Sequence, residues 1–257
     1  MPARRPLWMM ARAALVLVAV ALLNGAGTTR AAEKAVSATW LGPTGAQFEA
    51  PTHRYGHAIM GDLPEWGRLC LILVGERICV TLPQDRVFED IAPRLADLDH
   101  DSVPEIIVVE SSVQAGAALT VYRLNGDTLQ RIAAPPIGTR NRWLAPAGIA
   151  DLDGDGQIEI AYIDRPHLAK RLRIWRYANG ALTHVADAGQ LTNHRIGDPF
   201  ITGGLRACGN GPEIVTVSAD WRRIKASRLA AETITTRDLG PFDGPATMQA
   251  ALDCTTP

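Results

Sequence analysis

Short runs in which apolar and polar residues alternate dominate the chain, and they predict β-strands. The runs are rich in Val, Ile, Leu and aromatic residues, and Gly, Asn or Pro bounds them, which is how strands and turns are usually separated. The clearest runs cover residues 69–73, 119–124, 172–177, 181–185 and 214–217. Because no amphipathic pattern of convincing helical length interrupts them, we expect an all-β fold.

An acidic turn with two glycines precedes a further apolar run. The segment Asp151–Glu159 has the sequence DLDGDGQIE, with carboxylates at its first, third, fifth and ninth positions. Ca²⁺ takes about six to eight oxygen ligands, and a tight loop with inward carboxylates supplies them. An EF-hand is excluded, because it needs a glutamate at the twelfth position and flanking helices, whereas that position is Tyr162 in a strand-like run. A solvated turn without metal is the alternative.

The acidic turn repeats with a period of 54 residues. A weaker copy occupies Asp97–Glu105, and the Asn-Gly pairs at 125–126 and 179–180 show the same spacing. A third copy keeps its strand around Glu213 but has lost the acids, so we expect no metal there; its cation positions hold Leu205, Ala207 and Gly209. A fourth, shorter copy begins near Asp62. The repeats therefore start near residues 62, 97, 151 and 205.

These residues resemble the FG-GAP and VCBS repeats, the modules of integrin α-type β-propellers. Residues 151–160 match the family pattern Asp-x-Asp-Gly-Asp-Gly-x-x-(Asp/Glu) followed by an apolar strand, and the resemblance covers most of residues 60–225. It implies a β-propeller, and repeats of this length are typical of propeller blades. The number of copies predicts a small ring of about four or five blades, closed by a strand at residues 36–40 against the C-terminal segment.

The resemblance also implies which residues bind Ca²⁺. In the stronger loop these are Asp151, Asp153, Asp155, the carbonyl of Gln157, and Glu159. The corresponding candidates in the weaker loop are Asp97, Asp99, Asp101, Val103 and Glu105. There His100 and Ser102 replace the two glycines, at positions where left-handed backbone angles are wanted, so the weaker loop departs from the family pattern.

The first 32 residues have the features of a signal peptide. Three arginines precede the apolar segment 13–23, and Ala31-Ala32 offers small residues for cleavage. The segment is too short for a comfortable membrane span, although an uncleaved anchor is the alternative. We therefore expect a secreted or periplasmic protein with one domain at residues 33–257.

Charge and cysteine content fit an exported protein. Cleavage after residue 32 removes four arginines and no acids, so the formal charge changes from −1 to −5; this acidity does not favour nucleic-acid binding. An even number of cysteines in an oxidising compartment predicts disulfides. Cys70 and Cys79 flank Val74-Gly75 symmetrically, as in a hairpin, so we expect a Cys70–Cys79 bridge and, by default, Cys208–Cys254.

Three arginines occur at similar distances before the repeat starts. Arg54, Arg142 and Arg195 each follow a His or Asn, and pseudo-symmetry would place them around the axis, where they could bind a carboxylate or phosphate. The alternative is that they bond to carbonyls or acids between blades.

The sequence gives little support to catalysis. The chain has no Gly-x-Ser-x-Gly elbow, no His-Glu-x-x-His motif and no phosphate loop, and we interpret His57, His100, His167 and His184 as surface or loop residues. The favoured function is a calcium-stabilised binding, adhesion or scaffold module for a protein or glycan ligand, with a homodimer as one possible assembly. The alternatives are a cryptic hydrolase with its site at the propeller axis and a structural subunit of an envelope complex.

Overall fold

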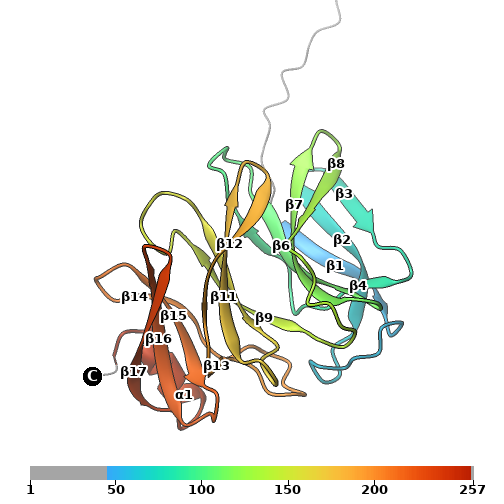
Figure 1. Ribbon diagram of the computed structural model, residues 1–257. Helices are drawn as coiled ribbons and strands as arrows, with labels where there is room; N and C mark the ends of the chain where they lie inside the picture. Colours follow the sequence, from blue (N-terminus) through green and yellow to red (C-terminus); the bar gives the residue numbers. More distant parts are fainter. Residues whose placement is uncertain (1–44, 256–257) are drawn as a thin grey trace, which may run out of the picture. The chain divides into compact units, whose positions relative to one another are not determined.

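Antiparallel strands account for most of the folded chain. The computed structural model describes residues 45–255, which belong to one compact unit (Figure 1). The first strands are β1 (Gly45–Thr52), β2 (Glu65–Leu73), β3 (Glu76–Thr81), β4 (Arg86–Phe88), β5 (Arg94–Ala96), β6 (Glu105–Ser112), β7 (Gly116–Asn125) and β8 (Thr128–Ala133). They are followed by β9 (Leu144–Ala150), β10 (Glu159–Asp164), β11 (Arg171–Ala178), β12 (Ala181–Ala188), β13 (Leu191–Thr192), β14 (Gly204–Ala207), β15 (Pro212–Ser218), β16 (Arg223–Ala230), β17 (Thr233–Pro241) and the helix α1 (Pro245–Leu252).

The strands form three antiparallel sheets. The first has the order β1-β2-β4-β6-β7-β8, with β3 paired to β2 and β5 paired to β6. The second has the order β12-β11-β10-β9, and the third has the order β13-β15-β16-β17 with β14 paired to β15. The prediction of an all-β fold is confirmed, whereas the closed ring stays a prediction. The expected strand at residues 36–40 and the expected signal peptide lie outside the described residues.

The sequence period corresponds to a repeated four-stranded meander. The strands β5 to β8, β9 to β12 and β14 to β17 follow one another in the same antiparallel order. Glu105 and Glu159 begin β6 and β10, and Glu213 is the second residue of β15. The period of 54 residues is therefore the distance between equivalent second strands of successive meanders.

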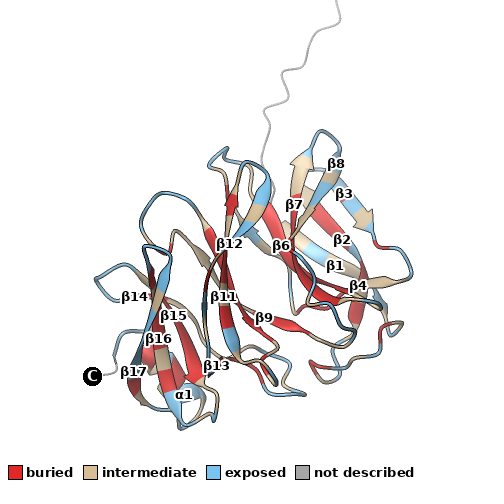
Figure 2. Cartoon of the chain, viewed as in Figure 1, coloured by how far each residue is buried: buried red, intermediate tan, exposed pale blue. Residues whose placement is uncertain are grey.

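The second strand of each meander is buried on both faces, because the sheets stack. In β10, Ile160 and Tyr162 pack with the first sheet, whereas Ala161 and Ile163 pack toward the third sheet. This alternation follows from the two-residue period of a strand. All six residues of β10 are buried. Figure 2 shows the buried strands β6 and β15 in red, with more exposed strands such as β8 and β17 at the sheet edges. The apolar runs in the sequence are these central strands.

The one helix of the described residues, α1, was not predicted from the sequence. Met248 and Ala251 of α1 pack on the face of the third sheet formed by residues such as Val215, Val217 and Ile224. The helix has eight residues and begins with Pro245, so its sequence is too short to show a clear helical period. It covers an apolar sheet face that a further meander would otherwise have to cover. Within the described residues, no helix is long and apolar enough to span a bilayer.

Both predicted disulfides are present. Cys70 and Cys79 lie directly opposite each other in the β2–β3 hairpin, whose turn contains Gly75 with a φ of 78°. The Cys208–Cys254 bridge joins the β14–β15 loop to the residues after α1. Such bridges indicate an oxidising compartment outside the cytoplasm.

Candidate functional site

The two acidic turns connect the first and second strands of their meanders, and the same backbone hydrogen bond closes both. Glu105 Oε2 accepts a bond from the Leu98 N–H at 2.9 Å, and Glu159 Oε2 accepts one from the Leu152 N–H at 2.8 Å. Both glutamates are buried, at 1% and 0% exposure. Each glutamate therefore ties the beginning of its loop to the beginning of a central strand.

The aspartates wind the two loops in the same way. Asp97 Oδ2 accepts a bond from the Ser102 N–H at 3.1 Å, and Asp151 Oδ2 accepts one from the Gly156 N–H at 3.0 Å. The third aspartate of each loop accepts a bond from the backbone N–H two residues later, at 2.8 Å in both. Aspartate favours such local bonds to the backbone, so the aspartates of each loop stabilise its turn.

The weaker loop follows the same path without glycine. His100 and Ser102 have φ values of 61° and 70°, and the equivalent Gly154 and Gly156 have 81° and 87°. Left-handed angles are therefore required at both positions, and non-glycine residues there cost on the order of 1 kcal/mol each. The His100 ring donates from Nε2 to the Gly156 carbonyl at 2.9 Å, so the two loops are also in contact.

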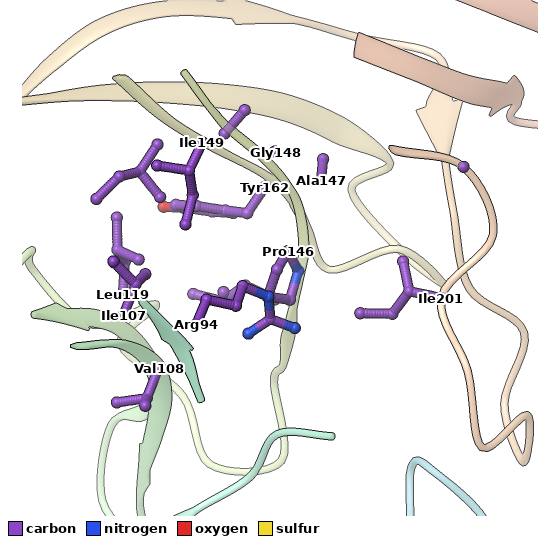
Figure 3. Close-up of a pocket in the computed structure, with 14 residues that line it drawn as sticks. Arg94, Ile107, Val108, Leu119, Pro146, Ala147, Gly148, Ile149, Tyr162 and Ile201 are labelled. Carbon is purple, nitrogen blue, oxygen red and sulfur yellow. The ribbon is translucent and has the colours of Figure 1, made fainter. Parts of the chain in front are cut away.

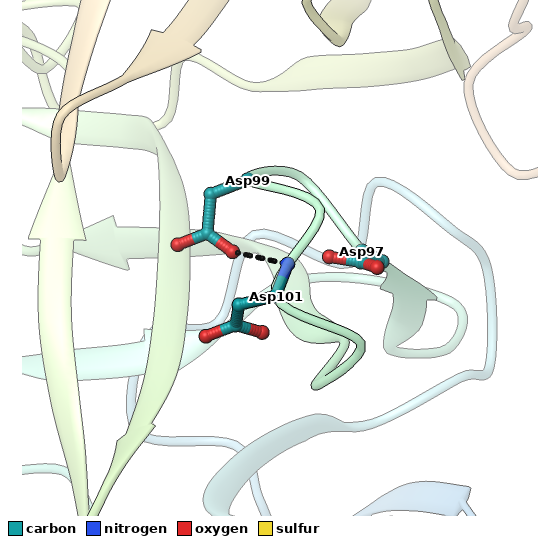
Figure 4. A group of neighbouring side chains, drawn as sticks. All are labelled: Asp97, Asp99 and Asp101. Atoms are coloured by element: carbon teal, nitrogen blue, oxygen red, sulfur yellow. Dashed lines mark hydrogen bonds between the residues drawn. The ribbon is translucent and has the colours of Figure 1, made fainter.

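Carboxylates converge in both loops in a manner that fits a hard cation. Ligand oxygens of Asp151, Asp153 and Glu159 lie within 4.8 Å of one another, and those of Asp97, Asp99 and Asp101 do the same. Figure 4 shows the second group on its turn, with the Asp101 N–H donating to Asp99. Oδ1 of Asp97 is buried and has no hydrogen-bond partner. An oxygen of this kind is what a bound Ca²⁺ would use.

A guanidinium approaches each loop from the neighbouring strand. Arg176 of β11 lies opposite Glu159, with Nε 2.6 Å from Glu159 Oε1 and Nη2 2.7 Å from Asp153 Oδ2. Arg123 of β7 is more loosely placed, because its Nη2 is 3.5 Å from Asp99 Oδ2 and 3.3 Å from Asp101 Oδ2. Arg176 thus offsets part of the negative charge of the stronger loop, and Arg123 offsets less of the charge of the weaker loop.

Burial opposes the charge on both glutamates. It raises the pKa of Glu105 to about 7, with a further contribution from Asp99 and Asp101. Burial also raises the pKa of Glu159, even though Arg176 acts in the opposite direction. Carboxylates in such surroundings gain stability from any cation that binds beside them.

The third repeat places arginines around its glutamate. Arg206 Nε and Nη2 lie 2.9 and 2.8 Å from Glu213 Oε2, and Arg206 Nη1 donates to the Ala251 carbonyl at 2.8 Å. Arg228 and Arg237 also contact this carboxylate. Although burial opposes the shift, hydrogen bonds from Arg237 and Arg206 lower the pKa of Glu213. Leu205, Ala207 and Gly209 bring no acid to this turn.

The three arginines proposed for ligand binding have different surroundings. Arg54 Nε donates to the Arg86 carbonyl at 2.9 Å. The guanidinium of Arg195 lies 4.1 Å from the ring centroid of Trp221. Arg142 Nη1 donates to the Asn141 carbonyl at 2.8 Å and lines a small cavity with His57 and His167. Of the three, only Arg142 lies in that cavity. This cavity was not predicted from the sequence. The two histidines lie in loops, as expected, but both are half-buried.

A second cavity, of about 300 Å³, opens among β5, β6, β9 and β10. Figure 3 shows its lining, which is apolar apart from Tyr162 and Arg94. Arg94 is held by Asp90, with Nη1 2.8 Å from Oδ2 and Nη2 3.1 Å from Oδ1. This lining contains neither a carboxylate nor an imidazole.

A family model described as an FG-GAP-like repeat matches residues 97–162. The match runs from the weaker acidic turn through the stronger one and into β10, so this part of the chain is similar to FG-GAP-like repeats. The resemblance inferred from the acidic turns is confirmed for FG-GAP, whereas the resemblance to VCBS repeats stays a prediction. No curated protein matches the chain.

Proposed function

We propose that the protein is an exported, calcium-stabilised repeat module of the propeller type that binds a protein or glycan and has no catalytic role. The observation that supports it best is the shared geometry of the two acidic loops, with clustered carboxylates and an unpartnered Asp97 oxygen. One ion would be held by Asp151, Asp153, Asp155, the Gln157 carbonyl and Glu159. A second would be held by Asp97, Asp99, Asp101, the Val103 carbonyl and Glu105.

Calcium at these positions would have a structural role. Glu105 and Glu159 begin the central strands β6 and β10, so an ion bound to them would join a loop to the most buried part of each meander. Its charge would offset the repulsion among the clustered carboxylates. Extracellular calcium modules have dissociation constants of roughly 10⁻⁴ to 10⁻³ M, which suits an ion that stabilises a fold outside the cell.

Thermal unfolding of the exported protein tests the calcium role. An ion present at ten times its dissociation constant stabilises the fold by about 1.4 kcal/mol, and a domain of this size changes its Tm by about 2–4 °C per kcal/mol. We expect a chelator to lower the Tm by about 3–6 °C per occupied site. Asp153→Asn should remove the part of this sensitivity that comes from its own loop, whereas the control Asp243→Asn, at an exposed position outside both loops, should retain all of it. If the chelator leaves the melting curve unchanged, the proposal is wrong.

Arg176 offers a sharper form of this test. Its guanidinium lies among the carboxylates that would bind the ion, so it should compete with calcium. Arg176→Met is therefore expected to lower the Tm in chelator and to raise the affinity of the loop for calcium. An equal loss of Tm with and without calcium would instead assign Arg176 a role independent of the ion.

The proposed function includes a propeller fold and a binding role without catalysis. Stacked four-stranded meanders are the way propeller blades pack. A hydrolase needs a nucleophile or activated water beside an acid or base, and the sequence has none of the common hydrolase motifs. We therefore favour a binding role over hydrolysis. Retention of the exported protein on a glycan or protein array only when calcium is present would support it.

A further inference from the structure

A small cavity at the loops between the sheets has features that neither the calcium loops nor the repeat packing explains. We call it the His57 cavity; its volume is about 170 Å³, and its walls include His57, Asn141, Arg142 and His167. It is separate from the acidic loops, none of whose residues lines it. It has hydrogen-bond acceptors, a cationic donor and an apolar wall.

His194 fixes the hydrogen-bonding state of His167. His194 is 1% exposed, and its Nε2 lies 2.9 Å from the Asp198 carbonyl, which can only accept, so His194 Nε2 carries a hydrogen. Its Nδ1 must then accept the bond from His167 Nε2 at 3.1 Å. Burial lowers the pKa of His167 to about 4, so the ring is neutral at pH 7. Its Nδ1 is therefore a hydrogen-bond acceptor, and it has no partner among the described residues.

Asn141, which lines the same cavity, has a second acceptor. Oδ1 of Asn141 is buried without a hydrogen-bond partner, which costs free energy unless a ligand or water satisfies it. Asn141 also has a φ of 53°, and Arg165 in the same cavity has 45°. Left-handed angles at non-glycine residues gather at ligand sites, and the Asn141 backbone is fixed by its N–H bond to the Tyr55 hydroxyl at 2.8 Å.

The cavity also has donors for an anion. Arg142 has no ion-pair partner in the described structure, whereas the neighbouring Arg165 is held by both oxygens of Asp164, at 2.8 and 3.1 Å. His57 Nδ1 lies 2.6 Å from Oε1 of Glu89, which is 1% exposed. Burial raises the pKa of Glu89, and the hydrogen bond from His57 acts in the opposite direction.

The rest of the wall is apolar. Trp143 is 2% exposed, and its indole donates to the Glu89 carbonyl at 2.8 Å, so its ring is available only for packing. Leu168 and Ile196 also line the cavity and are 63% and 69% exposed. An apolar wall with a few polar groups is the usual lining of a small-molecule site.

Two unpartnered acceptors, an unpaired guanidinium and an aliphatic rim require a ligand with the opposite groups. We propose that the His57 cavity binds a small aliphatic carboxylate with an amine or hydroxyl group on its α carbon. The carboxylate binds Arg142 and His57, the α-amine or α-hydroxyl donates to His167 and Asn141, and the aliphatic chain packs on the rim. The proposal goes beyond the protein- or glycan-binding role proposed above, and it does not depend on the calcium loops.

Isothermal titration of the exported full chain with four related compounds tests it. L-Leucine and 2-hydroxy-4-methylpentanoate carry both groups, 4-methylpentanoate lacks the α donor, and leucinol lacks the carboxylate. A hydrogen bond to a charged group contributes enough that losing it weakens binding by at least about tenfold. We expect the first two compounds to bind and the last two to bind at least about tenfold more weakly.

Variants assign the contacts. Arg142→Gln should weaken leucine binding about tenfold without changing leucinol binding, and His167→Phe should weaken leucine binding without changing that of 4-methylpentanoate. Arg222→Gln, whose side chain is 83% exposed, is the control and should leave all four unchanged. If a variant unfolds, the comparison of the four compounds on the wild-type protein still tests the proposed site.

Two results would overturn the proposal: no binding heat from any compound at millimolar concentration, or leucinol and 4-methylpentanoate binding as tightly as leucine. The titrations are repeated in chelator and in calcium. Absent ligand binding together with an intact calcium effect on the Tm would overturn this site alone, whereas a missing calcium effect would overturn the structural role of the ion alone.

Discussion

Arg206 offers the clearest energetic test of how the third repeat is held together. Its side chain is 3% exposed and contacts Glu213 through two nitrogens, while its third nitrogen donates to the Ala251 carbonyl in α1. It therefore links the last sheet to the helix that covers it. Arg206→Met removes the guanidinium and retains most of the apolar stem, so the change tests the charge rather than the packing.

The expected loss follows from these contacts. Breaking a buried ion pair costs about 3–5 kcal/mol, but Arg228 and Arg237 remain beside Glu213 and reduce that figure to about 2 kcal/mol. The lost bond to α1 adds about 1 kcal/mol. We therefore predict a decrease of about 3 kcal/mol in the free energy of unfolding. For a domain of this size the Tm should fall by about 6–12 °C.

Urea unfolding followed by tryptophan fluorescence measures this loss. The matched control is Arg237→Met, which removes a contact with the same carboxylate from a side chain that is 57% exposed. Exposed ion pairs contribute little, so the control should lose less than about 1 kcal/mol. Equal losses in the two variants would show that burial does not determine the strength of this cluster, and our reasoning would be refuted.

Three further predictions concern other parts of the fold. Replacing the Cys208–Cys254 pair with serines should lower the free energy of unfolding by about 4 kcal/mol, because the bridge closes a long loop; a loss below about 1 kcal/mol in urea would contradict this. Gly203→Ala should destabilise by about 3 kcal/mol or more, since its Cβ would lie 2.1 Å from the Val215 carbonyl oxygen at a φ of 102°. Gly126→Ala has a positive φ in open space and should cost only about 1 kcal/mol, so similar Tm values for the two variants would disprove the steric argument. His167 has its pKa lowered by burial from 6.5 to about 4, so its contribution to stability is complete above pH 6.5 and is lost as the pH falls through 4. The loss is about 1–2 kcal/mol after allowance for partial exposure, and it should be absent from the pH profile of His167→Gln.

The sequence predicts the features whose physical cause is local. The buried strands β6, β10 and β15 are visible as apolar runs, and the acidic turns are visible because aspartate and glycine determine their backbone. The Cys70–Cys79 bridge follows from the symmetry of one hairpin. In each case the residues that decide the structure lie within a few positions of one another, so spacing alone is informative.

The features that escaped prediction depend on contacts between distant segments. The helix α1 is stabilised by the face of the third sheet and by Arg206, and neither can be inferred from its eight residues. The His57 cavity brings together residues from 57 to 196, and nothing in the spacing of its histidines indicates that they meet. The guanidiniums of Arg123 and Arg176 could have been suspected, since each follows its glutamate by a similar interval on the next strand of the same meander.

The central claim is that the two acidic loops bind calcium, and equilibrium dialysis of the exported, metal-stripped protein against calcium tests it most directly. We predict that each wild-type chain takes up two ions, one per converging carboxylate group, and that Asp153→Asn takes up one. A wild-type protein that takes up no calcium at millimolar concentration, while its Tm in chelator equals its Tm in calcium, would contradict the account.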